Sequence, residues 1–172
     1  MPLTVLIGGA RSGKSALALQ LVADADEVVF VATAEARDEE MAERIERHRR
    51  DRPSEWRVVE EPIALRGAVE AAPPAAGVIV ECLSLWVSNL LEAGWADEAV
   101  EAEGEKAARV AANRPGATVV VTNEVGLGIV PETPLGRRYR DLLGRVNATF
   151  AAAADEAHFV VAGRTLPLHS WA

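Results

Sequence analysis

The chain has 172 residues, of which 49% are hydrophobic, so it is long enough to build a substantial core, and we expect one domain over residues 1–172. Its formal net charge of −8 argues against a general nucleic-acid binder, because such proteins carry a basic surplus. The apolar runs are too short for a membrane span, no targeting segment is visible, and Cys82 as the only cysteine excludes an internal disulfide. These features predict a soluble, cytoplasmic protein.

Short apolar segments alternate with helical segments along the chain. The apolar segments are continuous and rich in β-branched residues, which is typical of strands buried on both faces of a parallel sheet. In chain order the predicted elements are strand 4–8, helix 14–23, strand 28–33, helix 38–50, strand 56–60, helix 63–71, strand 78–82, helices 83–93 and 95–113, strand 118–123, helix 134–154 and strand 158–163. Strand 56–60 is expected at an edge. The alternation predicts an α/β fold with a mostly parallel sheet flanked by helices.

The segment GGARSGKS joins the first predicted strand to the first predicted helix. It matches the pattern G-x-x-x-x-G-K-S in the strand–helix context that this pattern requires. Backbone N–H groups of such a loop surround phosphate oxygens, Lys14 reaches the β- and γ-phosphates, and the Ser15 hydroxyl ligates Mg²⁺. A glycine-rich turn without a ligand is the plainer alternative, and the complete pattern argues against it. The predicted phosphate-binding residues are Gly8, Gly9, Ala10, Arg11, Ser12, Gly13, Lys14 and Ser15.

Two further groups of polar residues end predicted strands. Glu81 follows three apolar residues, and a carboxylate at the end of a buried strand is costly without a partner. Mg²⁺ with its waters is such a partner, which makes Ser15 and Glu81 the predicted metal ligands; a glutamate that simply reaches solvent is a serious competing interpretation. Asn123 and Glu124 end a later strand, at the edge where open α/β sheets bind ligands, and an ordinary turn is equally compatible with them.

Predicted helix 38–50 carries a local basic cluster. Arginines at positions 44, 47, 49, 50 and 52 crowd into nine residues and surround His48. Met41, Ile45 and His48 fall on one face of this helix at spacings of four and three. A solvated helix face is the commoner interpretation of such a charge run, whereas a small anionic ligand would explain a histidine among arginines in an acidic protein.

These segments together resemble the bifunctional adenosylcobinamide kinase / adenosylcobinamide-phosphate guanylyltransferase family of cobalamin biosynthesis. The resemblance covers nearly the whole chain and rests on GGARSGKS, on the stretch H-x-x-x-R-P-x-x-W that begins at His48, on VIVECLSLWVSNLL and on TNEVGLGIVP. It implies a RecA-like P-loop NTPase fold that assembles as a homotrimer. It also implies two reactions: phosphorylation of the aminopropanol hydroxyl of adenosylcobinamide by ATP or GTP, and transfer of GMP from GTP to adenosylcobinamide phosphate through a GMP-histidine.

The resemblance assigns roles to particular residues of this sequence. The guanylylated histidine corresponds to His48, and Lys14 acts in the kinase reaction. Some members carry a second histidine before the nucleophile where this chain has Arg47, so His48 is the only candidate. Beyond the P-loop, the implied nucleotide contacts are Thr33, Ala34, Glu35, Arg49, Arg50, Asp51, Arg52, Glu60 and Glu81. A P-loop small-molecule kinase without nucleotidyl transfer remains the alternative, and a nucleotide-binding protein without catalysis is a third.

Overall fold

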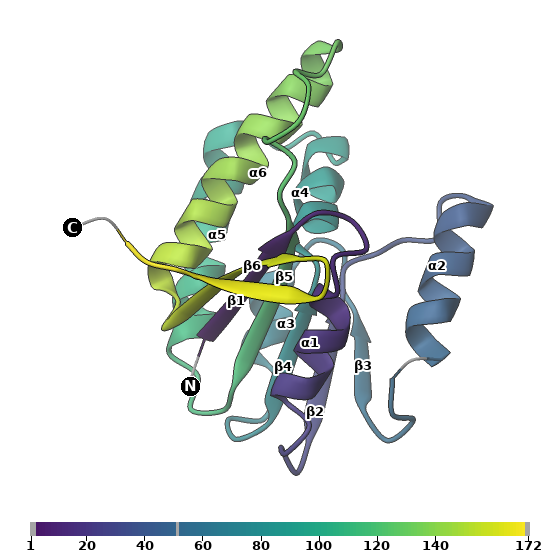
Figure 1. Ribbon diagram of the computed structural model, residues 1–172, viewed down its shortest axis with the longest axis vertical. Helices are drawn as coiled ribbons and strands as arrows, with labels where there is room; N and C mark the ends of the chain where they lie inside the picture. Colours follow the sequence, from purple (N-terminus) through teal and green to yellow (C-terminus); the bar gives the residue numbers. More distant parts are fainter. Residues whose placement is uncertain (1–2, 51, 171–172) are drawn as a thin grey trace.

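The computed structural model describes residues 3–50 and 52–170, apart from the side chains at positions 40, 44 and 48. The elements follow one another as β1 (Leu3–Gly8), α1 (Lys14–Leu21), β2 (Val28–Ala32), α2 (Glu39–Arg50), β3 (Arg57–Glu60), α3 (Leu65–Glu70), β4 (Gly77–Glu81), α4 (Leu83–Glu92), α5 (Asp97–Ala112), β5 (Thr118–Asn123), α6 (Pro134–Ala153), β6 (Glu156–Val161) and β7 (Arg164–Leu168). The predicted α/β fold is confirmed (Figure 1).

One twisted sheet organises the molecule. Its seven described strands lie in the order β3-β2-β4-β5-β1-β6-β7, and every neighbouring pair is parallel except β6 with β7. The prediction that residues 56–60 form an edge strand is confirmed, because β3 closes one side of the sheet. Residues 3–8 lie in the interior between β5 and β6, and all six are buried, which explains their uninterrupted apolar sequence.

The opposite edge differs from the prediction. Predicted strand 158–163 is displaced, because β6 ends at Val161 and the next two residues turn the chain back. Ala162 and Gly163 both have positive φ, 50° and 71°, which is the conformation of a two-residue hairpin turn. Strand β7 was missed: its five residues are all exposed, so they lack the apolar pattern of the inner strands. Pro167 is tolerated there because an edge strand leaves backbone groups unpaired.

The two faces of the sheet are covered unequally. Alternate residues of the inner strands point to opposite faces, so Val5 and Val31 belong to one core and Leu6 and Phe30 to the other. The larger core packs against α3, α4, α5 and α6, with Trp86 of α4 fully buried within it. The smaller core packs against α1, and α2 stands at the side of β3 (Figure 1). Within residues 3–50 and 52–170, no helix has both the length and the apolarity of a membrane crossing.

Candidate functional site

The loop between β1 and α1 takes the shape of a phosphate-binding loop. Gly13 precedes α1 with φ of 104°, a conformation that glycine adopts at no steric cost. The Lys14 side chain is buried and its Nζ donates to the carbonyls of Gly8 at 3.0 Å and Gly9 at 2.6 Å, and to Ser12 Oγ at 3.3 Å. The ammonium therefore lies inside the loop, where phosphate oxygens would meet it together with the N-terminus of α1.

The turn after β6 supports this loop from the far side. The Gly163 N–H donates to the Ser12 carbonyl at 2.9 Å. A Cβ placed on Gly8 would approach the Val160 carbonyl oxygen to 2.2 Å, so only glycine fits where β1 passes β6. In Figure 1 the β6–β7 turn lies beside the loop that precedes α1. The missed hairpin thus has a role that the sequence pattern did not indicate, since it holds the loop in place.

The two predicted metal ligands meet. Ser15 Oγ of α1 donates to Glu81 Oε1 at 2.5 Å, although 66 residues separate them in sequence. Glu81 ends β4, whose neighbours on the two sides are β2 and β5, so it stands at the carboxyl edge of the parallel strands. A hydroxyl and a carboxylate are hard oxygen donors of the kind that Mg²⁺ prefers, and they adjoin the phosphate loop, so this pair fits a nucleotide-bound Mg²⁺.

The segment after β2 is fixed at the same edge. Thr33 is buried, and its N–H donates to the Glu81 carbonyl at 3.0 Å. Its hydroxyl donates to the Cys82 carbonyl at 2.8 Å and accepts from the Cys82 N–H at 2.7 Å. Ala34 is half-buried and Glu35 exposed. Cys82 is buried. One backbone hydrogen bond therefore joins a predicted nucleotide contact that follows β2 to another at the end of β4.

Helix α2 and the residues after it face this edge from outside the sheet. Arg49 Nη2 lies 3.3 Å from Glu60 Oε1 of β3, and Arg49 also pairs with Glu46 at 3.6 Å. Arg50 Nε donates to the Glu46 backbone carbonyl at 3.4 Å. The backbone of His48 belongs to α2, but its side chain and the whole of Asp51 lie outside the described residues.

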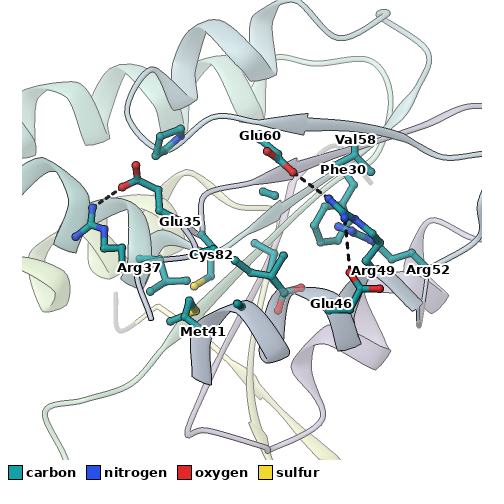
Figure 2. A pocket seen from close by; sticks show the side chains of 18 residues that line it. Phe30, Glu35, Arg37, Met41, Glu46, Arg49, Arg52, Val58, Glu60 and Cys82 are labelled. Atoms are coloured by element: carbon teal, nitrogen blue, oxygen red, sulfur yellow. Dashed lines mark hydrogen bonds and ion pairs between the residues drawn. The ribbon is translucent and has the colours of Figure 1, made fainter. Parts of the chain in front are cut away.

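Arg52 stands between two hollows of the surface. Its guanidinium lies 4.1 Å from the centre of the Phe30 ring, a cation–π contact. Burial lowers the pKa of Arg52, and the nearby Arg49 lowers it further. A cavity of about 710 Å³ lies between α2 and the strand ends, with Glu35 and Arg37 at one end and Arg49 and Glu60 at the other (Figure 2). A second hollow of about 930 Å³ contains the phosphate loop.

The two hollows share a wall. Phe30, Arg52, Glu81 and Cys82 line both of them. The structure therefore brings the P-loop, Glu81, Arg52 and Glu60 around two adjoining hollows, with Asn123 at the P-loop end. Arg50 is exposed and lines neither hollow.

Glu124 is not directed into either hollow. Its side chain accepts from the Gly126 N–H at 2.5 Å, and its own N–H donates to the Gly8 carbonyl at 3.1 Å. It is thus a residue of the turn after β5, the alternative that the sequence left open.

The motif at residues 8–15 lies between an inner strand and a helix, and the hydroxyl–carboxylate pair of Ser15 and Glu81 adjoins it. These features define a P-loop nucleotide-binding protein. A sequence profile described as cobinamide kinase / cobinamide phosphate guanyltransferase matches residues 4–168. The chain belongs to this family.

Individual relatives agree with the family assignment. The bifunctional adenosylcobalamin biosynthesis protein CobU of Escherichia coli (strain K12) is 42% identical over 172 residues, which cover 92% of this chain and 95% of that protein. The bifunctional adenosylcobalamin biosynthesis protein CobP of Pseudomonas aeruginosa is 41% identical over 168 residues, with 95% of each chain covered. A solved ATPase from the type III secretion system of pathogenic bacteria superposes with a TM-score of 0.58 at 13% identity, over 92% of this chain and 50% of that one. That likeness supports the P-loop ATPase fold.

Proposed function

We propose that this protein phosphorylates the aminopropanol hydroxyl of adenosylcobinamide and then transfers GMP from GTP to adenosylcobinamide phosphate, giving adenosylcobinamide-GDP. The observation that carries the proposal is the pair of adjoining hollows, because they place a phosphate loop next to an arginine-lined cavity under α2. The two reactions need attack at two different phosphorus atoms, γ in the first and α in the second. A single nucleotide whose triphosphate extends from the loop toward α2 would present both phosphorus atoms.

In the kinase reaction the substrate hydroxyl attacks the γ-phosphorus of ATP or GTP, and the bond to the β-phosphate oxygen breaks. Lys14 and the backbone N–H groups of the loop stabilise the charge on the transferring group. Lys14 would exchange its bonds to loop carbonyls for phosphate oxygens when the nucleotide enters. Ser15 and Glu81 would hold Mg²⁺, which when bound neutralises charge on the phosphates.

In the guanylyl transfer the nucleophile is the neutral imidazole of His48. It attacks the α-phosphorus of GTP, a P–N bond forms, and pyrophosphate leaves with the bonding electrons. Arg49 and Arg52, which line the cavity, would bind phosphate oxygens. A phosphate oxygen of adenosylcobinamide phosphate then attacks the same phosphorus, and the P–N bond breaks.

Assembly and location belong to the proposal as well. The family resemblance implies a cytoplasmic homotrimer, in which α2 would present His48 to a site completed by a neighbouring copy. The loop before α6 supports a protein contact, since Ile129 is 96% and Leu127 80% exposed. Analytical ultracentrifugation tests this part, and a fully active monomer would dismiss it.

The test of the proposed function uses three substrates and one preparation. Adenosylcobinamide with ATP and Mg²⁺ is expected to give adenosylcobinamide phosphate, and added GTP is expected to give adenosylcobinamide-GDP with release of pyrophosphate. A protein that stops at the phosphate is a kinase without nucleotidyl transfer. A protein that binds GTP but converts neither corrinoid is a binding protein, and either result rejects the proposal.

A further inference from the structure

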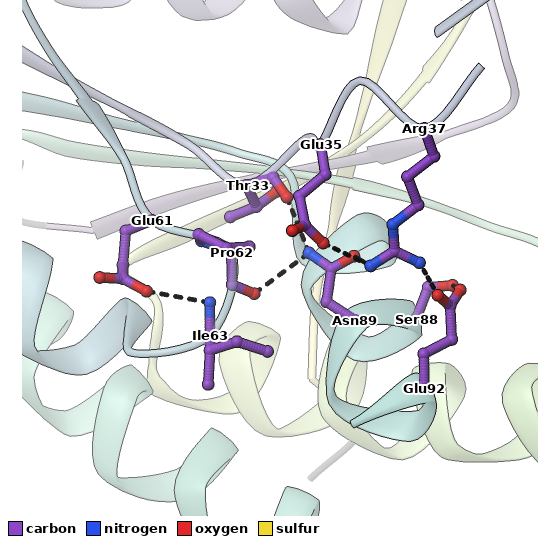
Figure 3. Close-up of polar contacts among 9 residues, drawn as sticks. All are labelled: Thr33, Glu35, Arg37, Glu61, Pro62, Ile63, Ser88, Asn89 and Glu92. Atoms are coloured by element: carbon purple, nitrogen blue, oxygen red, sulfur yellow. Dashed lines mark hydrogen bonds and ion pairs between the residues drawn. The ribbon is translucent and has the colours of Figure 1, made fainter. Parts of the chain in front are cut away.

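Asn89 of α4 joins three segments that are distant in sequence. Its side chain is buried, with 5% exposed. Its Nδ2 donates to the Thr33 carbonyl at 2.8 Å and to the Pro62 carbonyl at 3.1 Å, and its Oδ1 accepts from Arg37 Nη2 at 3.0 Å (Figure 3). The amide thus connects the end of β2 and the start of the β3–α3 turn to α4, with both polar atoms satisfied.

Arg37 extends this connection. Its guanidinium forms ion pairs with Glu35 on its own segment and with Glu92 of α4, in addition to the hydrogen bond that it donates to Asn89 (Figure 3). An exposed ion pair alone contributes little to stability. Arg37 differs from that case because one planar guanidinium engages three partners on two elements, an arrangement that a flexible ammonium cannot reproduce.

The segment held in this way, residues 33–38, leads directly into the N-terminus of α2. Residue 33 is bonded to β4, and Asp38 caps the helix by accepting from the Met41 N–H at 2.7 Å. Residue 37 is therefore the last position before the cap at which the segment is fixed to the body of the protein. At its other end α2 is linked to β3 through Arg49 and Glu60. A shift at residue 37 would tilt the whole helix, including position 48.

We propose that Asn89 and Arg37 are positioning residues for guanylyl transfer: they fix the segment that leads into α2 and so set the distance between His48 and the α-phosphate of GTP. The inference rests on the proposed function. The phosphate loop has its own supports, namely the Lys14 bonds and the contact from Gly163, none of which involves residues 34–37. Loss of the Arg37 contacts should therefore affect the two reactions differently.

Four variants test the proposal: Arg37→Ala, Arg37→Lys, Asn89→Ala and the control Arg66→Ala. Arg66 is matched to Arg37, since both side chains are 43% exposed and both have two acidic partners, but Arg66 joins α3 to α5 away from the site. For each variant we would measure kcat and KM for GMP attachment from α-labelled GTP, the rate of adenosylcobinamide phosphorylation, and the thermal midpoint. Because Asn89 is buried and its variant can fail to fold, the Arg37 variants decide the outcome.

The expected result is a selective loss. Misplacing a nucleophile by about 1 Å lowers its rate on the order of 10- to 100-fold, so Arg37→Ala should lower kcat for GMP attachment by about that factor while KM for GTP stays close to wild type. Phosphorylation should change by less than about twofold, Arg37→Lys should recover only part of the loss, and Arg66→Ala should leave both reactions unchanged. Equal slowing of both reactions by Arg37→Ala, or wild-type GMP attachment, overturns the inference.

Hydrogen exchange separates this inference from the proposed function, because it needs no turnover. Arg37→Ala should speed amide exchange in peptides from α2 and leave the peptides of the P-loop unchanged. Unchanged exchange in α2 rejects the positioning role whatever the activity. A wild-type protein that performs neither reaction rejects the proposed function, and the inference about guanylyl transfer with it.

Discussion

Replacing Lys14 with alanine should separate a catalytic role from a structural one. The ammonium donates to the carbonyls of Gly8 and Gly9 and to the Ser12 hydroxyl. The Gly8 carbonyl also accepts from the Glu124 N–H at 3.1 Å, so it keeps a partner in the variant, and Gly9 is exposed to water. We therefore expect the free energy of unfolding to fall by only about 1–2 kcal/mol. For a chain of this size, that lowers the thermal midpoint by about 2–8 °C.

The expected kinetic effect of Lys14→Ala is much larger. Removal of one charged donor aimed at the reacting group costs on the order of 10²–10³-fold in kcat. The measurement is adenosylcobinamide phosphorylation under saturating nucleotide, with circular dichroism and a melting curve on the same preparation. A folded variant that phosphorylates at a near-normal rate would refute the P-loop mechanism. A variant that does not fold would refute the stability reasoning, because the loop would then depend on the ammonium.

Three other predictions address the metal pair, the core and an ionisable group. Glu81→Gln keeps the size of the side chain but removes its charge beside Ser15, so the Mg²⁺ concentration for half-maximal activity should rise on the order of 10- to 100-fold. Arg114→Met should lower the free energy of unfolding by about 3 kcal/mol, measured in urea, because the buried guanidinium donates to four backbone carbonyls around the end of α3. Burial raises the pKa of Tyr139 to about 12. The stabilisation from its neutral phenol should therefore be complete below about pH 10, the ordinary pKa, and be lost as the pH rises toward 12.

Each of these three predictions has a result that would contradict it. Tyr139 is the only tyrosine of the chain, so phenolate absorbance reports it alone, and a midpoint near 10 in the native protein would contradict the burial argument. Tyr139→Phe should lack the alkaline loss of stability over the same range. An Arg114→Met protein as stable as wild type would mean that the four carbonyls find other donors. Unchanged Mg²⁺ dependence in Glu81→Gln would remove Glu81 from the metal site.

The parts of the fold that the sequence predicted are those with strong local signals. Inner strands such as residues 4–8 have no solvent-facing side, so their apolar runs are uninterrupted. The motif at residues 8–15 specifies a turn, a helix start and a phosphate site together. The meeting of Ser15 with Glu81 was predicted from chemistry alone, since the carboxylate needed a partner at the end of its strand.

What the sequence missed depends on contacts between distant segments. Strand β7 has no apolar pattern because it is an exposed edge, and only its hydrogen bonds to β6 define it. Asn89 sits among the apolar residues of α4, and its pattern gave no sign that its partners would be Thr33 and Arg37. A polar amide within an apolar helix face is the signal that points to such a residue, because a buried amide needs several polar partners.

The central claim is that His48 carries GMP, and one labelling experiment tests it most directly. The protein is incubated with Mg²⁺ and α-labelled GTP, denatured, and its label is followed in acid and in base. We predict that wild-type protein is labelled through a bond that acid breaks and base does not, whereas folded His48→Ala takes up no label and still phosphorylates adenosylcobinamide. Acid-labile GMP on the His48→Ala protein, or equal loss of both reactions in a correctly folded variant, would contradict the account.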